Sequence, residues 1–278
     1  MTAQILDGKK AAEEIRASLK KEISCMPKKP GLAAIIVGDN PASKLYVGIK
    51  RKTCDEVGIY SELHELPEAT SEEDLLKLIR KLNGDEKING ILIQLPLPKH
   101  INEENIFSEI ALEKDVDGFH AVNMGRLMRA EERVVPCTPK GVIRLLEKYN
   151  IEIKGKNVVI VGRSKIVGRP LALMLLNRDA TVTICHTKTQ NCSEKTRMAD
   201  ILIGAAGCPK LIRADMVKDG AVVVDIGTTK VENKLVGDVD FDSVKGKASW
   251  ITPVPGGIGP MTVAMLLENT VQAAKREK

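Results

Sequence analysis

A chain of 278 residues that is 43% hydrophobic and 28% charged is long and apolar enough for two domains, which excludes a disordered chain. Lys and Arg exceed Asp and Glu by 42 to 37, a mild excess without the clustered basic stripe or the aromatic content of a nucleic-acid binder. No apolar run reaches the roughly 18 to 20 residues of a membrane span, and the N-terminus lacks a signal-peptide pattern. We therefore expect a cytoplasmic protein that binds neither nucleic acid nor membrane and acts on anionic small molecules.

Helices and strands alternate through the first half of the chain. Helical spacing predicts helices over 9–26 and 40–57, the second with Ser43 as its N-cap, and a third helix opened by Ser71. Between them, apolar runs predict strands over 32–37, 60–66 and 90–95. This order is typical of βαβ units in a mostly parallel sheet.

A second series of alternating elements begins after Cys137. Thr138 can cap and Pro139 can open a helix to about Tyr149. Strands are predicted over 156–162, 180–185, 200–205 and 221–227, with helices over 170–177 and 261–275. The series resembles a doubly wound nucleotide-binding sheet. The predicted fold class is thus α/β with two domains. The first is an α/β substrate domain that comprises residues 1–120 and, because the last helix returns to it, about 263–278. The second is a Rossmann-like, doubly wound domain over 121–262.

The six cysteines, at positions 25, 54, 137, 185, 192 and 208, form no C-x-x-C pair and have no histidine ligand set. Cys185 and His186 are adjacent, but neighbouring strand residues point to opposite faces. We expect reduced, mostly buried thiols and no metal site.

A loop rich in proline and glycine precedes the last helix, in the segment Ile251-Thr-Pro-Val-Pro-Gly-Gly-Ile-Gly-Pro-Met-Thr262. Proline fixes φ and glycine opens otherwise forbidden conformations, so the segment forms a rigid loop with accessible peptide groups. Such a loop favours a surface built against a flat ligand or cofactor, and a purely structural corner is the alternative.

The turn from Val161 to Pro170 joins a strand to a helix, where backbone N–H groups favour a phosphate. Gly162 and Gly168 fit neither standard glycine fingerprint. Arg163 and Ser164 can bind a 2′-phosphate, and the next strand ends at Thr187-Lys188 where an NAD enzyme usually has an acid, so NADP is favoured over NAD. The alternative is a strand–turn–helix whose basic residues are simply solvated.

Three further positions carry polar groups suited to chemistry. Tyr46 and Lys50 lie one helical turn apart. A lysine beside an apolar wall and near other cations can lose its proton and act as a base. The alternative is that the two residues are only a surface pair. Gln94 interrupts an apolar strand near its carboxyl end, where α/β sheets bind ligands, unless it is a structural glutamine. In Asp115-Val-Asp117-Gly, one carboxylate can bind an aminopyrimidine-like edge, or the segment is an Asx-stabilised turn. The nearby His120 has no nucleophile pattern and is assigned no role.

Five colinear motifs, spanning nearly the whole chain, together resemble the bifunctional methylenetetrahydrofolate dehydrogenase/methenyltetrahydrofolate cyclohydrolase family. They are 41–52, Gly90-Ile-Leu-Ile-Gln-Leu-Pro-Leu-Pro98, Lys114-Asp-Val-Asp-Gly-Phe119, Gly162-Arg-Ser-Lys-Ile-Val-Gly168 and 252–262. The resemblance implies oxidation of 5,10-methylenetetrahydrofolate with NADP⁺ and hydrolysis of the methenyl product to 10-formyltetrahydrofolate, in one-carbon metabolism. It also implies a homodimer.

The resemblance also implies roles for single residues. Lys50 would be the general acid/base, held by Gln94, while Tyr46 would position or stack on the folate and Asp117 would anchor the pterin. The folate would also lie against Ile93 and Leu95 and the rigid wall that contains Pro255, Gly256, Gly257, Gly259 and Pro260. The cofactor would be bound by Gly162, Arg163, Ser164, Thr187 and Thr228.

Two positions depart from the usual family pattern. Thr228-Thr229 follows Ile226-Gly227 where relatives usually have Ile-Asn, which leaves the contact on the nicotinamide side open. Thr187 replaces a frequent serine and keeps the hydroxyl. Two other functions remain possible: a dehydrogenase with weak or no cyclohydrolase activity, and a non-catalytic dinucleotide-binding protein on the same scaffold.

Overall fold

The computed structural model describes residues 2–232 and 234–276, which form two compact units. The three-stranded unit comprises Glu14–Arg126, Glu132–Cys137 and the described residues from Val263 on. The six-stranded unit comprises the described residues up to Glu13, Leu127–Glu131 and Thr138–Thr262. Within the described ranges, no helix is long and apolar enough to cross a membrane.

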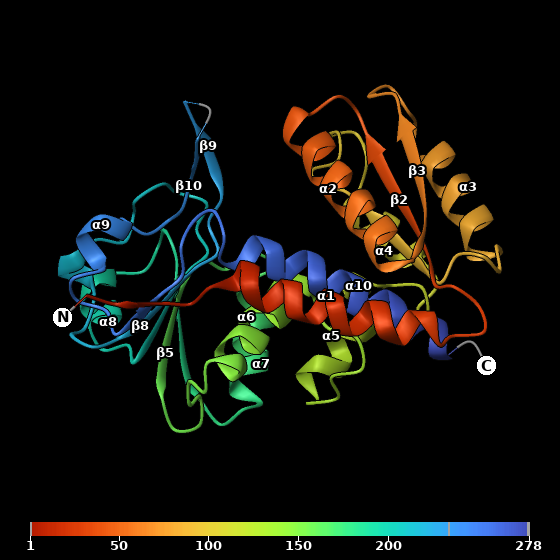
Figure 1. The fold of residues 1–278 in the computed structure, drawn as a ribbon. Helices are drawn as coiled ribbons and strands as arrows, with labels where there is room; N and C mark the ends of the chain where they lie inside the picture. The colour runs from red at the N-terminus through yellow and green to blue at the C-terminus, as the bar shows by residue number, and fades with distance from the viewer. Residues whose placement is uncertain (1, 233, 277–278) are drawn as a thin grey trace. The chain divides into compact units, whose positions relative to one another are not determined.

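The three-stranded unit is built on a parallel sheet of order β3-β2-β4 (Figure 1). Its strands and helices are β2 (Gly31–Val37), α2 (Pro41–Val57), β3 (Tyr60–Leu66), α3 (Glu72–Asn83), β4 (Gly90–Ile93), α4 (Glu103–Glu109) and α5 (Ala121–Met128). Two further helices, α1 (Gly8–Ser24) and α10 (Ile258–Arg276), are divided between the two units, and the last two residues of α5, Leu127 and Met128, group with the six-stranded unit.

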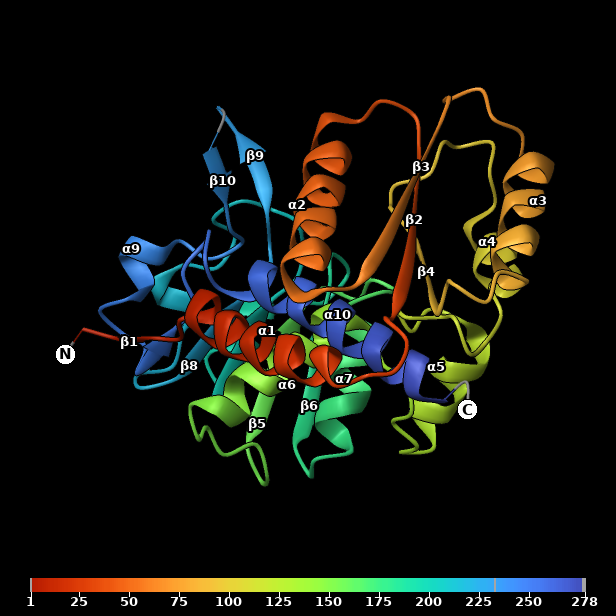
Figure 2. The same cartoon turned by 45° about the vertical axis from the view of Figure 1, so that its right-hand side comes forward.

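Strand β2 is the centre of this sheet, and all seven of its residues are buried. Ala33, Ile35 and Val37 share a core cluster with Leu75 and Ile79 of α3. Helices α2 and α3 lie on opposite sides of the sheet in both views (Figure 2). A strand covered on both faces needs a continuous apolar run rather than an alternating one, as the sequence of β2 has.

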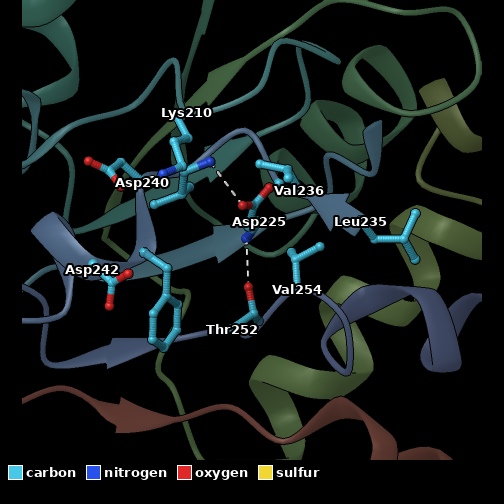
Figure 3. A pocket seen from close by; sticks show the side chains of 11 residues that line it. Lys210, Asp225, Leu235, Val236, Asp240, Asp242, Thr252 and Val254 are labelled. Carbon is cyan, nitrogen blue, oxygen red and sulfur yellow. Dashed lines mark hydrogen bonds and ion pairs between the residues drawn. The ribbon is translucent and has the colours of Figure 1, made fainter. Parts of the chain in front are cut away.

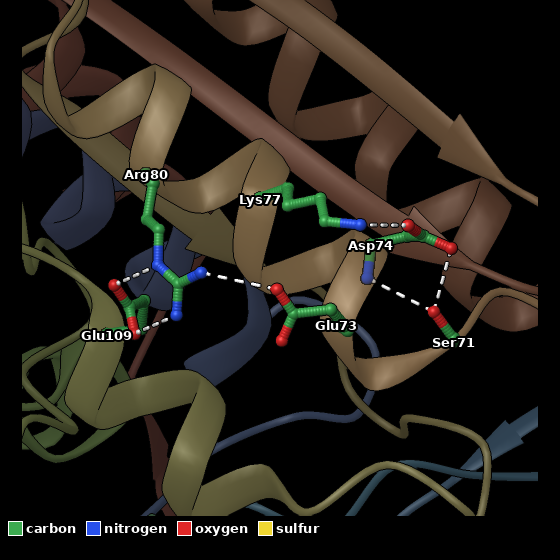
Figure 4. Close-up of polar contacts among 6 residues, drawn as sticks. All are labelled: Ser71, Glu73, Asp74, Lys77, Arg80 and Glu109. Atoms are coloured by element: carbon green, nitrogen blue, oxygen red, sulfur yellow. Dashed lines mark hydrogen bonds and ion pairs between the residues drawn. The ribbon is translucent and has the colours of Figure 1, made fainter.

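Helix α3 begins as the sequence predicts. The hydroxyl of Ser71 accepts a hydrogen bond of 3.1 Å from the backbone N–H of Asp74, which makes Ser71 the N-cap. Near the other end of the helix, Arg80 binds both carboxylate oxygens of Glu109 on α4, at 3.0 and 3.3 Å, and also reaches Glu73 (Figure 4). Ser71 thus fixes the start of α3, and the ion pair between Arg80 and Glu109 connects α3 to α4.

The predicted N-cap of α2 was wrong. Asn40 caps the helix instead, because its Oδ1 accepts hydrogen bonds from Ala42 and Ser43 at 3.0 and 3.1 Å while Pro41 occupies the first turn. The Ser43 hydroxyl is buried and donates to the carbonyl of Leu95 at 3.4 Å. Ser43 thus connects the start of α2 to the segment that follows β4.

The six-stranded unit contains a sheet of order β1-β11-β8-β7-β5-β6, in which every neighbouring pair is parallel. Its strands are β1 (Gln4–Ile5), β5 (Asn157–Val161), β6 (Thr181–Cys185), β7 (Ile201–Gly204), β8 (Val222–Asp225) and β11 (Trp250–Ile251). The other elements are α6 (Cys137–Lys148), α7 (Gly168–Leu176), α8 (Cys192–Thr196), η1 (Ala214–Met216), α9 (Phe241–Val244) and the antiparallel hairpin β9 (Thr229–Val231) and β10 (Lys234–Val236).

The bounds of the two units and the first residues of two helices differ from those predicted from the sequence. The sequence placed residues 1–120 in the first domain, but β1 pairs with β11, so the described residues up to Glu13 group with the six-stranded unit. Helix α10 begins at Ile258 rather than at Met261, and its residues from Val263 on group with the three-stranded unit. Helix α6 already begins at Cys137, so Thr138 lies inside it and is not its cap.

Candidate active site and cofactor site

Lys50 and Gln94 form the polar centre of the three-stranded unit. The ammonium Nζ of Lys50, on α2, donates a hydrogen bond of 3.0 Å to Oε1 of Gln94. Gln94 directly follows β4, where its backbone N–H donates to Ile35 and its side-chain Nε2 donates to the carbonyl of Leu95 at 2.8 Å. With the amide nitrogen committed to Leu95, the amide oxygen of Gln94 faces Lys50.

The other predicted residues around this pair differ in exposure. Tyr46 is half-buried on α2, one turn before Lys50. Ile93 is 3% exposed and belongs to the core, and Leu95 is half-buried against the same core cluster. At the carboxyl end of β4, Gln94 is therefore the polar side chain and Ile93 and Leu95 form its apolar support.

The two carboxylates of Asp115-Val-Asp117 have different environments. Asp115 is buried and accepts hydrogen bonds from the backbone N–H groups of Gly118, Phe119 and His120, at 2.9 to 3.2 Å, and from the side chain of Asn123. The turn interpretation of the sequence thus applies to Asp115, and the ligand-binding interpretation of the other carboxylate stays a prediction. Asp115 builds the turn, and Asp117 is the carboxylate beside Lys50.

The carboxyl group of Asp117 is enclosed by protein although part of the residue is exposed. Burial raises the pKa of Asp117 to about 6, while the positive charge of Lys50 and the thiol of Cys137 act in the opposite direction and Asp115 adds to the rise. An Asp with this pKa is mostly ionised at neutral pH and can accept hydrogen bonds from two neighbouring N–H groups of a ligand.

Sequence reasoning missed two residues behind Asp117. The thiol of Cys137 donates to the carbonyl of Val116 at 3.3 Å, and Nδ2 of Asn269, on α10, donates to the same carbonyl at 2.8 Å and to that of Val135 at 3.3 Å. Asn269 is 6% exposed. The signal available in the sequence was the amide of Asn269 within the mostly apolar last helix.

In the six-stranded unit, the turn after β5 leaves no room for side chains at its two glycines. A Cβ on Gly162, whose φ is +131°, would lie 2.0 Å from the carbonyl oxygen of Ala205. A Cβ on Gly168 would lie 2.3 Å from the carbonyl oxygen of Gly162. Glycine at both positions brings the backbone of the turn close to the strand ends, which is the shape a dinucleotide diphosphate needs.

Ser164 and Arg163 lie on the exposed side of this turn. The hydroxyl of Ser164 accepts hydrogen bonds from the backbone N–H groups of Val167 and Gly168, at 3.1 and 3.3 Å, so it stabilises the start of α7. Thr187, in the turn after β6, and Thr228, after β8, are both exposed as well. Because β5, β6 and β8 are parallel strands of one sheet and these residues follow their carboxyl ends, the predicted cofactor residues lie along the same edge of the sheet.

The loop from Pro255 to Pro260 is held by the start of the chain. Gly256 has a φ of +111°, and its carbonyl accepts a hydrogen bond of 2.8 Å from Lys9. A Cβ on Gly8 would lie 1.9 Å from the carbonyl oxygen of Gly257. Part of the glycine content therefore serves this contact, whereas Pro255 is exposed, as is Gly259 in the first turn of α10.

All six cysteines are free thiols. Three of them are buried, including Cys54, but Cys25 and Cys208 are exposed, so the expectation of mostly buried thiols holds only in part. Burial raises the pKa of the Cys54 thiol to about 12, which keeps it protonated although Lys50 lies one turn away. His120 has a structural role, since its Nδ1 accepts a hydrogen bond from the backbone of Val122 at the start of α5.

Known proteins share this architecture over the whole chain. A protein from Moorella thermoacetica described as bifunctional protein FolD is 59% identical over 99% of this chain and 100% of its own length. The crystal structure of the bifunctional enzyme FolD, a methylenetetrahydrofolate dehydrogenase/cyclohydrolase from Campylobacter jejuni, is 51% identical and superimposes with a TM-score of 0.97, covering 99% of this chain and 100% of that one. A FolD structure from Trypanosoma brucei, complexed with NADP cofactor and inhibitor, is 41% identical with a TM-score of 0.96, covering 100% and 99%.

Two family profiles match successive parts of the sequence. Residues 6–117 match the catalytic domain of tetrahydrofolate dehydrogenase/cyclohydrolase, and residues 136–278 match the NAD(P)-binding domain of the same enzymes. The first range includes Lys50, Gln94 and Asp117, and the second includes the glycine turn after β5. The chain belongs to the tetrahydrofolate dehydrogenase/cyclohydrolase family.

Proposed function

We propose that the protein oxidises 5,10-methylenetetrahydrofolate to 5,10-methenyltetrahydrofolate with NADP⁺ and then hydrolyses this product to 10-formyltetrahydrofolate, as a step of one-carbon metabolism. The observation that carries the proposal is the hydrogen bond of 3.0 Å between Lys50 and Gln94, with the ionisable Asp117 beside Lys50. A proton carrier and a carboxylate anchor are the groups that methenyl hydrolysis and pterin binding require.

Lys50 carries the protons of the hydrolytic step. As water attacks the methenyl carbon, the side chain of Lys50 takes a proton from it, and the same side chain returns a proton to N5 of the folate when the bond from N5 to that carbon breaks. The hydroxyl proton leaves as the formyl group forms, so one proton is released overall. Gln94 keeps the Lys50 side chain oriented through its amide oxygen.

The other residues bind and orient the folate. Asp117 accepts hydrogen bonds from the ring N–H and the amino group of the pterin, and Tyr46 stacks on or positions the ring. Ile93 and Leu95 support Gln94 from the core side.

NADP⁺, when bound, supplies the acceptor for the hydride. The backbone at Gly162 fits the diphosphate because a Cβ there is excluded. The exposed guanidinium of Arg163 would bind the 2′-phosphate, and Ser164 and Thr187 would provide hydroxyls to the cofactor. Thr228 contributes through its main chain. The Trypanosoma brucei relative complexed with NADP supports this choice of cofactor.

An assay of both activities tests the proposal. Purified protein is supplied with 5,10-methylenetetrahydrofolate and either NADP⁺ or NAD⁺, and reduced cofactor and methenyl product are followed separately. We expect turnover with NADP⁺ without accumulation of the methenyl product. Accumulation of that product would favour a dehydrogenase without cyclohydrolase activity, and the absence of turnover would favour a non-catalytic dinucleotide-binding protein.

Lys50→Gln isolates the hydrolytic step. The change removes the proton carrier and leaves the six-stranded unit untouched, so hydrolysis of methenyltetrahydrofolate should fall by about 10² to 10⁴-fold while the Kd of NADP⁺ stays unchanged. Lys52→Gln, an exposed lysine on the same helix, is the matched control. Equal hydrolysis by wild type and Lys50→Gln would refute the role of Lys50.

We further propose that the enzyme is a cytoplasmic homodimer.

A further inference from the structure

Two buried carboxylates lie outside the residues assigned so far. Asp225 is the last residue of β8 and is 3% exposed. Asp238 follows β10 and is 0% exposed. A buried carboxylate is costly unless hydrogen bonds or charges compensate it, so the partners of these two groups explain why they are there.

Asp225 organises the strand end from which it projects. Its own N–H donates to the hydroxyl of Thr252 at 2.7 Å (Figure 3). Its carboxylate accepts hydrogen bonds from the N–H groups of Gly227 at 3.0 Å and of Asp238 and Val239 at 2.9 Å. Asp225 thus fixes both the turn that leads to Thr228 and the backbone that carries Asp238.

Asp238 organises a different loop, the one that follows β7. Its carboxylate accepts hydrogen bonds from three successive N–H groups, those of Ala206 at 2.5 Å, Gly207 at 3.0 Å and Cys208 at 2.8 Å. Three amides that converge on one carboxylate determine the path of this loop, although it has no regular secondary structure.

Close packing makes this arrangement specific. A Cβ on Gly227 would lie 2.2 Å from Oδ1 of Asp238, and a Cβ on Gly237 would lie 1.9 Å from Oδ2 of Asp225. On the other side of the loop, the carbonyl of Ala205 occupies the space beside Gly162. The loop over residues 205–208 is therefore held by Asp238 on one side and forms the support of the glycine turn on the other.

We propose that Asp238 is a positioning residue for the dinucleotide site, which sets the loop over residues 205–208 so that the glycine turn at Gly162 keeps its phosphate-binding shape. The inference rests on the proposed function, since it assumes that the turn binds NADP⁺. Asp225 supports Asp238 by binding its N–H group and by fixing the turn before Thr228. Both carboxylates act through the backbone amides that they bind.

The test measures NADP⁺ binding and cofactor-independent hydrolysis in the same proteins. Asp238→Asn replaces one acceptor oxygen with an NH₂ group, so at least one of the three loop amides meets a donor. Calorimetry should show the Kd of NADP⁺ rising about tenfold or more, equivalent to about 1.4 kcal/mol. Hydrolysis of methenyltetrahydrofolate, for which Lys50 lies in the three-stranded unit, should stay within about twofold of wild type.

Two further variants separate positioning from general destabilisation. Gly227→Ala keeps the Asp238 carboxylate but displaces it, and it should raise the Kd of NADP⁺ in the same way. Asp242→Asn is the matched control, since this side chain is 83% exposed, pairs with Lys245 at 2.7 Å and should leave the Kd unchanged.

The possible outcomes distinguish the inference from the proposed function. Wild-type protein that does not bind NADP⁺ would refute the proposed function and the inference with it. Wild-type affinity for NADP⁺ in both Asp238→Asn and Gly227→Ala would refute the inference alone. A lower melting temperature and a loss of both activities in Asp238→Asn, with an unchanged Kd for NADP⁺, would also refute the inference. A merely structural residue would give that result.

Discussion

Gly162→Ala is the most direct perturbation of the proposed cofactor site. The new Cβ would lie 2.0 Å from the oxygen and 2.5 Å from the carbon of the Ala205 carbonyl, so backbone must move by more than about 1 Å to restore ordinary contact. The φ of +131° adds strain for any residue with a side chain. Overpacking costs about 1–3 kcal/mol and strained backbone about 1–3 kcal/mol, so we expect a loss of about 2–6 kcal/mol in the free energy of unfolding.

Denaturant unfolding and NADP⁺ calorimetry measure the two consequences. We expect Gly162→Ala to lower the unfolding midpoint and to weaken NADP⁺ binding strongly, because the substitution displaces the turn itself. Gly246→Ala is the control: it lies in the same unit, and a Cβ there would meet no atom within 4 Å. Equal stability and equal NADP⁺ affinity in the two variants would refute the close-packing argument for Gly162.

Two further predictions concern cofactor choice and pH. Arg163→Ala should weaken NADP⁺ by about 1.5–3 kcal/mol and NAD⁺ much less, since only NADP⁺ presents a 2′-phosphate; equal losses in Kd for both cofactors would contradict the assignment. Because burial raises the pKa of Asp117 to about 6, its carboxylate becomes protonated and loses acceptor capacity as the pH falls through that value, so the KM for the folate substrate should rise between pH 7 and 5. Asp117→Asn should remove this pH dependence, and a flat wild-type profile would contradict the anchoring role.

The sequence predicted those elements whose cause is local. An unbroken apolar run over 32–37 was sufficient for β2, and Ser71 followed by Glu72 and Glu73 was sufficient for the start of α3. Residue patterns also placed Lys50 on a helix and Gln94 at the carboxyl end of a strand. Their hydrogen bond joins residues 44 positions apart, so residue patterns alone supplied the two groups, while the family resemblance and then the fold supplied their contact.

Elements whose cause is not local were missed or misplaced. Strand β1 has two exposed residues, too few for a periodic pattern, and exists because β11 offers a parallel edge. The cap of α2 was misplaced because Asn40 and Ser43 are both good cap residues and the choice depends on the buried contact between Ser43 and Leu95. The sequence of the helix start does not contain that contact.

The tripeptide Asp-Val-Asp occurs twice and shows where prediction from sequence stops. In both copies the first carboxylate, Asp115 or Asp238, is buried and accepts backbone N–H groups, and the third residue, Asp117 or Asp240, points to a different partner. The amides bound by Asp115 lie 3 to 5 residues ahead, which is a local turn that a sequence can indicate. Those bound by Asp238 lie 30 to 32 residues earlier, so the tertiary fold is needed to bring them together. A single carboxylate that accepts hydrogen bonds from three backbone amides fixes a loop without regular secondary structure. In this chain, Asp115 fixes the turn that contains the proposed pterin anchor in this way, and Asp238 fixes the loop that supports the proposed phosphate turn.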